Sequence, residues 1–282
     1  MFNFKRVAKK VQTNTNPKSG QRKSSSKTAW GTGLLVFGLV TVVSFVYHLP
    51  ASWVVQQASE NGVILQNIKL TEVQGTLWTG QAHIALVEQK QAQSLGQMHW
   101  QLSALALLSL HIDSDFSLLT STGGSRGNVS TGLLNQQQIE LSELQGQIPV
   151  SDLQPLLPKA YRNLGELKGQ LELDNVGLVW DSSSNWLSAI NGSLAFSQLD
   201  VMGVTFPTLV ITPSLQENDI RLETIGGGEG WNLSGQALVN MKQYQADFKI
   251  QADKPETMPD WTDLVMRKNS AVLATYKQKG RF

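Results

Sequence analysis

The chain has 282 residues, of which 41% are hydrophobic and 16% are charged, and its formal net charge is +1. This length suits one long domain or two modest ones, and so small a net charge does not by itself predict any partner. Because the chain has no cysteine, disulfides, zinc–thiolate sites and thiol nucleophiles are excluded.

The first 28 residues form a basic tail that differs sharply from the rest of the chain. They contain no Asp or Glu, whereas the other 254 residues carry 15 bases against 22 acids. The tail is rich in Ser, Asn, Thr and Gly, a composition typical of a disordered arm. We interpret it as a cytoplasmic orientation signal that contacts anionic lipid, in preference to a nucleic-acid-binding segment. Its bases are Lys5, Arg6, Lys9, Lys10, Lys18, Arg22, Lys23 and Lys27.

Residues 29–48 are predicted to form a single transmembrane helix. The stretch from Ala29 to Tyr47, AWGTGLLVFGLVTVVSFVY, contains no charged residue, and its length matches the ~30 Å hydrocarbon core of a bilayer. Trp30 and Tyr47 bracket it, as interfacial aromatic residues do, and Pro50 follows.

A signal peptide is the main alternative for this segment. Its apolar region usually has only ~7–15 residues, and the HLPASWVV that follows here is a poor cleavage site. Since Lys and Arg stay on the cytoplasmic side of a span, residues 1–28 are expected in the cytoplasm. In a bacterial cell, residues 49–282 then form a periplasmic domain on the inner membrane. The apolar SALALLSL at 103–110 is too short to cross back, and we expect it in the core.

The exported part, residues 49–282, is predicted to be mainly β. In YQADFKIQAD (Tyr244 to Asp253) apolar and polar residues alternate, which is typical of a half-buried strand. LSGQALVNM (233–241) alternates in the same way, and LELDNVGLVW (171–180) is also strand-like. Helix is expected only in short pieces, within 151–165 and 50–60. One periplasmic domain is expected, with a division into two lobes near 145–165 as an alternative.

A short glycine pattern recurs at the starts of alternating runs. It has an apolar residue two positions before a glycine and an apolar or small residue two positions after it. Glycine at such a point allows a bend, a bulge or a close backbone approach. The pattern therefore predicts a curved, largely antiparallel sheet. The five copies are VQGTL (73–77), LQGQI (144–148), LKGQL (167–171), INGSL (190–194) and LSGQA (233–237).

No motif argues for an enzyme, a metal site or a cofactor. His111, Asp113 and Asp115 fall on one strand face, but a metal site normally needs a further ligand and orienting partners. Arg126 in GGSRG and the glycines of GGGEG (226–230) are more simply explained as turns, because no helix follows them as in a phosphate or dinucleotide site. We expect no catalytic, metal-binding or cofactor-binding residue.

Two distinctive stretches follow the predicted span: LTEVQGTLWTGQAHI (Leu70 to Ile84) and, soon after it, MHWQLSALALLSLHIDSDF (Met98 to Phe116). This arrangement resembles the N protein family of the bacterial type II secretion system, the general secretion pathway. The sharpest motif lies from Gly75 to Gly80. The residues that we assign to the structural motif are Gly75, Leu77, Trp78, Gly80 and Trp100.

The resemblance implies an accessory, non-enzymatic part of an inner-membrane platform that exports folded periplasmic proteins across the outer membrane. Its partners would be other inner-membrane and periplasmic components of that machinery and the membrane lipid. The curved sheet and the eight tryptophans leave an alternative, a periplasmic carrier of lipid or another hydrophobic ligand. A third hypothesis is an envelope hydrolase that uses His111, Asp113 and Asp115.

Overall fold

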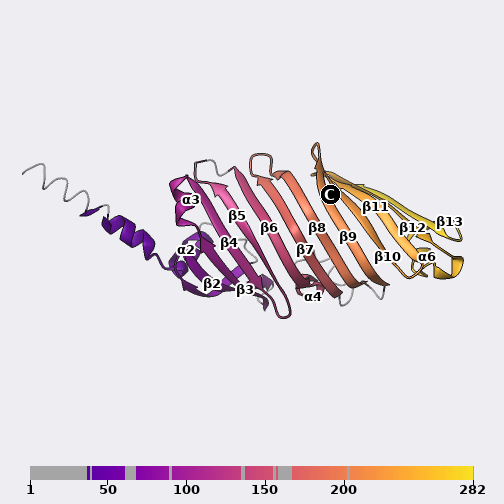
Figure 1. Cartoon of the computed structure of the whole chain (residues 1–282), viewed down its shortest axis with the longest axis horizontal. Coiled ribbons are helices and arrows are strands. Elements are labelled where there is room, and N and C mark those ends of the chain that lie inside the picture. The colour runs from indigo at the N-terminus through magenta and orange to yellow at the C-terminus, as the bar shows by residue number, and fades with distance from the viewer. Residues whose placement is uncertain are drawn as a thin grey trace, which may run out of the picture. The chain divides into compact units, whose positions relative to one another are not determined.

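The computed structural model describes residues 37–38, 40–60, 68–88, 91–134, 137–154, 157, 167–201 and 204–281. Residues 47–282 form one compact unit. Its described part is a single layer of strands with a few short helices at its ends (Figure 1). The prediction of a mainly β, largely antiparallel domain is confirmed.

Fourteen strands are found within the described residues, and all of them belong to one antiparallel sheet. They are β1 (Ile68–Gly75), β2 (Thr79–Glu88), β3 (Gln91–Leu102), β4 (His111–Leu119), β5 (Gly124–Gly132), β6 (Gln138–Pro149), β7 (Lys168–Asp181), β8 (Trp186–Val201), β9 (Val204–Gln216), β10 (Asp219–Gly228), β11 (Trp231–Val239), β12 (Gln243–Ala252), β13 (Arg267–Ser270) and β14 (Leu273–Arg281). The helical segments are α2 (Ala51–Glu60), α3 (Ala104–Leu108), α4 (Val150–Leu153), η2 (Pro255–Thr257) and α6 (Thr262–Val265).

From β1 to β12 the strands lie side by side in chain order. The last two exchange places, because β14 pairs with β12 and β13 lies at the edge beyond β14. Successive connections therefore alternate between the two ends of the strands. We call the end that carries α3, together with the connection from β1 to β2, the α3 end. The opposite end carries α4 and is called the α4 end (Figure 1).

The recurring glycine pattern marks close backbone approaches in the sheet. A Cβ atom built on any of the five glycines would lie less than 3.0 Å from a neighbouring heavy atom: Gly75, Gly146, Gly169, Gly192 and Gly235. Register shifts occur beside several of them, for example between Lys168 and Gln170 of β7. Such bulges bend a strand and increase its twist locally.

Two apolar clusters stabilise the sheet. One lies where β6, β7 and α4 meet and includes Ile148, Val150 and Leu171. The other lies at the C-terminal strands, where Trp231, Ile250 and Met258 are buried. Ile250 and Ala252 are buried on the face predicted from the YQADFKIQAD alternation, and that prediction is confirmed.

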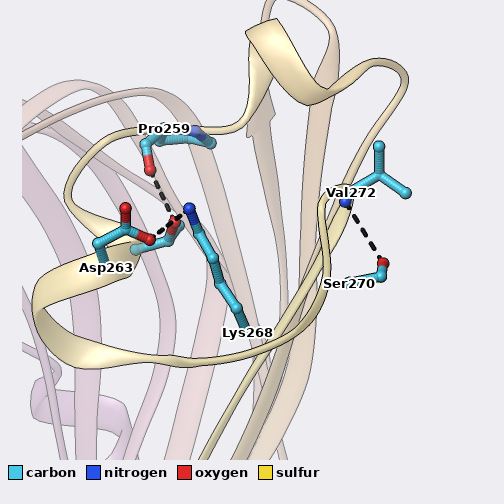
Figure 2. Close-up of polar contacts among 6 residues, drawn as sticks. Pro259, Asp263, Lys268, Ser270 and Val272 are labelled. Carbon is cyan, nitrogen blue, oxygen red and sulfur yellow. Dashed lines mark hydrogen bonds and ion pairs between the residues drawn. The ribbon is translucent and has the colours of Figure 1, made fainter.

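The second cluster is covered by residues 253–266, a segment that we call the strap. Thr257 Oγ1 donates to Gly230 O over 2.7 Å, and Thr262 Oγ1 donates to Pro259 O over the same distance. Near the end of the strap, Asp263 Oδ1 forms an ion pair of 2.5 Å with Lys268 Nζ of β13 (Figure 2). Met258 of the strap is buried in this cluster, and Trp261 packs against it.

The predicted transmembrane helix lies mostly outside the described residues. Residues 37–38 and 40–47 are helical, and Thr41 Oγ1 donates to Phe37 O over 2.8 Å. Among the residues that the structure describes, no helix combines the length and the apolar character needed to cross a bilayer. The span from 29 to 48 therefore stays a prediction.

Several local predictions differ from the structure. Of the helix expected within 151–165, the described part is α4 at Val150–Leu153; the segment joins β6 to β7, which pair with each other. SALALLSL was expected in the core but forms the exposed helix α3, where Leu105 and Leu108 are 78% and 82% exposed. Only eight residues connect β3 to β4 there, so the segment caps the end of the sheet instead of lying between layers.

The two glycine-rich stretches that were expected as turns are mostly strand. Gly124 to Gly127 lie in β5, and Gly226 to Gly228 lie in β10. At Gly228 the Trp231 ring occupies the space of a side chain, since a Cβ there would lie 2.6 Å from Trp231 Nε1. The glycines therefore serve close packing within the sheet more than turn formation.

Candidate functional site

The connection from β1 to β2 is a tight corner built around two glycines. Gly75 has φ +92°, a left-handed conformation that side chains disfavour, and a Cβ on it would lie 2.4 Å from Thr79 O. Gly75 pairs with Gly80 across the corner. Thr76 N donates to Thr79 O over 2.8 Å and closes the turn. This backbone path accordingly favours glycine at position 75.

The Trp100 ring lies over this corner from β3. A Cβ on Gly80 would lie 2.2 Å from Cζ2 of that ring, and Trp100 Nε1 donates to Leu77 O over 3.2 Å. Trp78 is half-buried, and its carbonyl accepts a hydrogen bond of 2.6 Å from Leu102 N. The structure thus brings the five motif residues together, with Trp100 and not Trp78 covering the second glycine.

The corner also holds the segment that directly follows the predicted span. Leu77 N donates to Leu49 O over 2.9 Å, and Pro50 forms an isolated antiparallel bridge with Thr76. The Tyr47 ring stacks on the Trp78 ring, with centroids 6.5 Å apart and planes inclined by 30°. We call these residues, 47–50 with 75–80 and Trp100, the anchor corner. It fixes the start of the 47–282 unit to the sheet through backbone bonds and one aromatic stack.

A continuous row of small and apolar residues crosses one face of the sheet. Paired residues of antiparallel strands lie on the same face, so the register defines this row from β2 to β14. We call it the ladder: Ala82, Met98, Leu118, Ser125, Gly146, Leu173, Leu194, Ile211, Thr224, Gly235, Phe248 and Tyr276. The neighbouring row from Ile148 through Leu171, Phe196 and Leu209 to Ile250 is also apolar apart from a glycine. One face of the sheet is therefore predominantly apolar.

The opposite face is mainly polar and carries the residues of the hydrolase hypothesis. Asn128 Nδ2 donates to Asp113 Oδ1 over 2.5 Å and to Asp115 Oδ1 over 3.1 Å, and His111 Nδ1 lies 2.8 Å from Ser109 O. The two carboxylates thus share an amide donor on the solvated face. No group of three potential metal ligands is found among the described residues.

Arg126 lies on the same polar face, in a setting that disfavours an anion. Its exposed side chain lines a shallow hollow together with Glu172 and Asp174. A second hollow beside it is lined by Arg126 and Asp115. Carboxylates around the guanidinium give the hollow negative charge, so the structure offers no cradle for phosphate at GGSRG.

The sequence did not identify Tyr47 and Leu49 as part of the motif's environment. Their contacts join residues about thirty positions apart, and neither periodicity nor a short motif carries that information. The aromatic cluster of Phe206, Trp231 and Trp261 was also missed as a unit. Trp261 lies 5.3 Å from Phe206 and 6.3 Å from Trp231 between ring centroids.

Comparison with known proteins gives one consistent result. A family model described as "Type II secretion system (T2SS), protein N" matches residues 66–271, which include β1 to β13. Among curated proteins, the chain is similar to the type II secretion system protein N of Vibrio cholerae serotype O1 (strain ATCC 39315 / El Tor Inaba N16961). The two are 30% identical over 267 residues, which cover 90% of this chain and 99% of that relative. No solved structure gives a significant match.

Proposed function

The chain belongs to the protein N family of the type II secretion system, and on this premise we propose that it is an accessory, non-catalytic inner-membrane component. In this role it supports the export of folded periplasmic proteins across the outer membrane. The family match over residues 66–271 is the observation that carries the proposal. The shared donor between Asp113 and Asp115 agrees with a structural use of these carboxylates.

We further propose a single-pass topology, with residues 1–28 in the cytoplasm, a span at 29–48 and residues 49–282 in the periplasm. Support comes from the helical residues 37–38 and 40–47, whose apolar side chains are exposed apart from half-buried Val46. A helix that is apolar all round requires an apolar environment. The partners in this arrangement are other inner-membrane and periplasmic components of the secretion machinery.

Deletion of the gene tests the role in secretion. Under conditions that require the pathway, a clean deletion should leave type II substrates in the periplasm, and the full chain supplied in trans should restore their release. Normal secretion by the deletion strain would remove the proposal.

A second candidate function rests on the ladder. A face that stays apolar from β2 to β14 suits a hydrophobic ligand such as a lipid acyl chain, and most of its side chains are only half-buried. In this alternative the protein is a periplasmic lipid carrier or a chaperone of hydrophobic molecules.

Native mass spectrometry of the detergent-extracted full chain distinguishes the two candidates. Ile211 and Thr212 are neighbours in β9 on opposite faces, with Ile211 on the ladder. A carrier should retain lipid, lose it on Ile211→Asp and keep it on Thr212→Asp. A wild-type chain that is empty under these conditions would rule out the carrier.

A further inference from the structure

The α3 end of the sheet exposes four leucines that belong to neither apolar cluster. Leu105 and Leu108 on α3 are 78% and 82% exposed, and Leu110 directly after the helix is 50% exposed. Leu134, in the connection from β5 to β6, is 83% exposed. We call Leu105, Leu108, Leu110 and Leu134 the apolar rim.

The members of the apolar rim are held together by the backbone. Leu133 N donates to Leu110 O over 2.9 Å, so the connection from β5 to β6 lies against the residue that follows α3. Ser103 caps α3, with its hydroxyl accepting from Ala106 N over 3.3 Å. The cap and the interstrand bond fix the exposed leucines on one short stretch of the sheet's end.

The apolar rim lies close to the first residue after the predicted span. Leu77 N binds Leu49 O, and the next residue, Trp78, accepts from Leu102 N at the end of β3. One residue further, Ser103 caps α3. Two hydrogen bonds and a few residues of chain therefore separate Leu49 from α3. Because Leu49 is covalently joined to residue 48, the end of the proposed span, this holds whatever the direction of the helix.

The chemistry of the apolar rim suits a lipid surface. Residues 102–112 and 129–139 contain no Asp, Glu, Lys or Arg, so no charge would lose its hydration on contact with acyl chains. Exposed apolar groups clustered at one end of a domain mark an interaction site. Trp53, which is 52% exposed and lies four residues after Leu49, is of the type that settles at the membrane interface.

We propose that the apolar rim inserts into the periplasmic leaflet of the membrane that anchors the chain, so that the α3 end of the sheet rests on the lipid surface. The proposal rests on the topology given under Proposed function. The proposal explains why the apolar residues of SALALLSL are exposed: they contact lipid instead of a protein core.

Spin labels on the full chain test this inference. The natural chain has no cysteine, so Leu105→Cys, Leu108→Cys and Leu134→Cys each give one labelling site. Leu264→Cys is the matched control, because Leu264 on α6 is 84% exposed but belongs to the strap, which leaves β12 at the α4 end. Each labelled chain is placed in nanodiscs of phosphatidylethanolamine and phosphatidylglycerol, and collision rates with oxygen and with a water-soluble nickel chelate are compared.

The three labels on the apolar rim should collide with oxygen in preference to nickel, at least threefold more than the label at position 264. Aqueous behaviour at all four sites, in chains that resist carbonate extraction, would overturn the inference while leaving the span intact. Labels on the rim that are shielded from both reagents would also overturn it, because a second copy or a protein partner then covers the leucines. Chains that carbonate removes would refute the span and this inference with it.

Discussion

At the scale of single residues, the anchor corner depends on glycine at two positions for different reasons. At Gly75 the constraint is the backbone, with a left-handed φ and a carbonyl oxygen 2.4 Å from the site of a Cβ. At Gly80 the constraint is the Trp100 ring. A backbone atom cannot move aside without changing the turn, whereas a ring can shift. Position 75 is therefore the more sensitive of the two.

Gly75→Ala should lower the free energy of unfolding by about 1–3 kcal/mol, the usual cost of a left-handed non-glycine residue, with the contact to Thr79 O adding to it. Urea unfolding of the full chain in detergent, followed by tryptophan fluorescence, measures the change.

Gly177→Ala is the matched control for this substitution. Its Cβ would meet only the side-chain oxygen of exposed Asn191 at 2.5 Å, with the next atom at 3.5 Å. The amide can rotate away, so the variant should stay within about 0.5 kcal/mol of the natural chain. Equal stability of the two alanine variants would show that the corner tolerates a side chain at position 75.

Asp181 is the residue whose titration the structure predicts. The Ser183 hydroxyl donates to Asp181 Oδ1 over 2.6 Å and the Ser183 amide over 2.8 Å, and these bonds hold the pKa of the carboxyl below its usual value. Because the folded-state pKa is lowered, the contribution of this turn is present above the unfolded pKa and is lost as pH falls through the folded one. Ser183→Ala should raise the pKa toward the ordinary range, as read from the carboxyl carbon by NMR.

Ser182→Ala should leave that titration unchanged, since Ser182 Oγ donates to Gln137 O and not to Asp181. The same midpoint in the Ser183→Ala variant and the natural chain would contradict the assignment.

At the scale of elements, the strap closes the C-terminal cluster. It crosses from β12 to β13, and Trp261 packs against Phe206 and Trp231 beneath it. The exposed ion pair of Asp263 with Lys268 adds little to stability, because such surface pairs contribute about 0–1 kcal/mol. The aromatic packing should therefore hold the strap in place.

Trp261→Ala should destabilise the C-terminal strands by about 3 kcal/mol, the lower end of the cost of truncating a packed tryptophan. It should also increase binding of the apolar dye ANS, because the cluster loses its cover. Leu264→Ala on the same helix removes an exposed side chain and should change neither quantity. An unchanged dye signal in Trp261→Ala would mean that the strap stays closed without this ring.

The sequence predicts the strands better than the segments that connect them. Alternation identified β12, with Ile250 on its buried face, because a half-buried strand repeats every two residues. It failed for SALALLSL, since apolar composition alone does not distinguish a core segment from an exposed cap at the end of a sheet. The glycines of GGSRG and GGGEG misled for a related reason: glycine signals close packing inside a strand as well as a turn.

Much less of the candidate site could be predicted. The motif residues were identified, but the contacts of Leu77 with Leu49 and of Trp78 with Tyr47 join distant parts of the chain. Trp78 is the aromatic residue that lies between the two glycines in sequence. In the structure the covering ring is Trp100, which the register of β2 with β3 brings opposite Gly80. Such pairings depend on tertiary register and are not written in any local pattern.

At the scale of the whole molecule, three features follow one another along the chain: a proposed span, an anchor corner directly after it and an extended sheet with one apolar face. They fit the role proposed above, a non-catalytic component at the membrane that serves secretion. The family to which the chain belongs agrees with that use. We expect that the chain is needed for type II secretion and that His111, Asp113 and Asp115 are not.

The fraction of a type II substrate found in the medium tests this claim most directly. It is measured in a deletion strain that carries no copy, the natural chain, or a chain with His111→Ala, Asp113→Asn and Asp115→Asn together. We expect a strong loss of secretion without the chain and full restoration by both proteins. Unimpaired secretion in the deletion strain would contradict the role in secretion. Failure of the correctly folded triple variant to restore secretion would contradict the non-catalytic role.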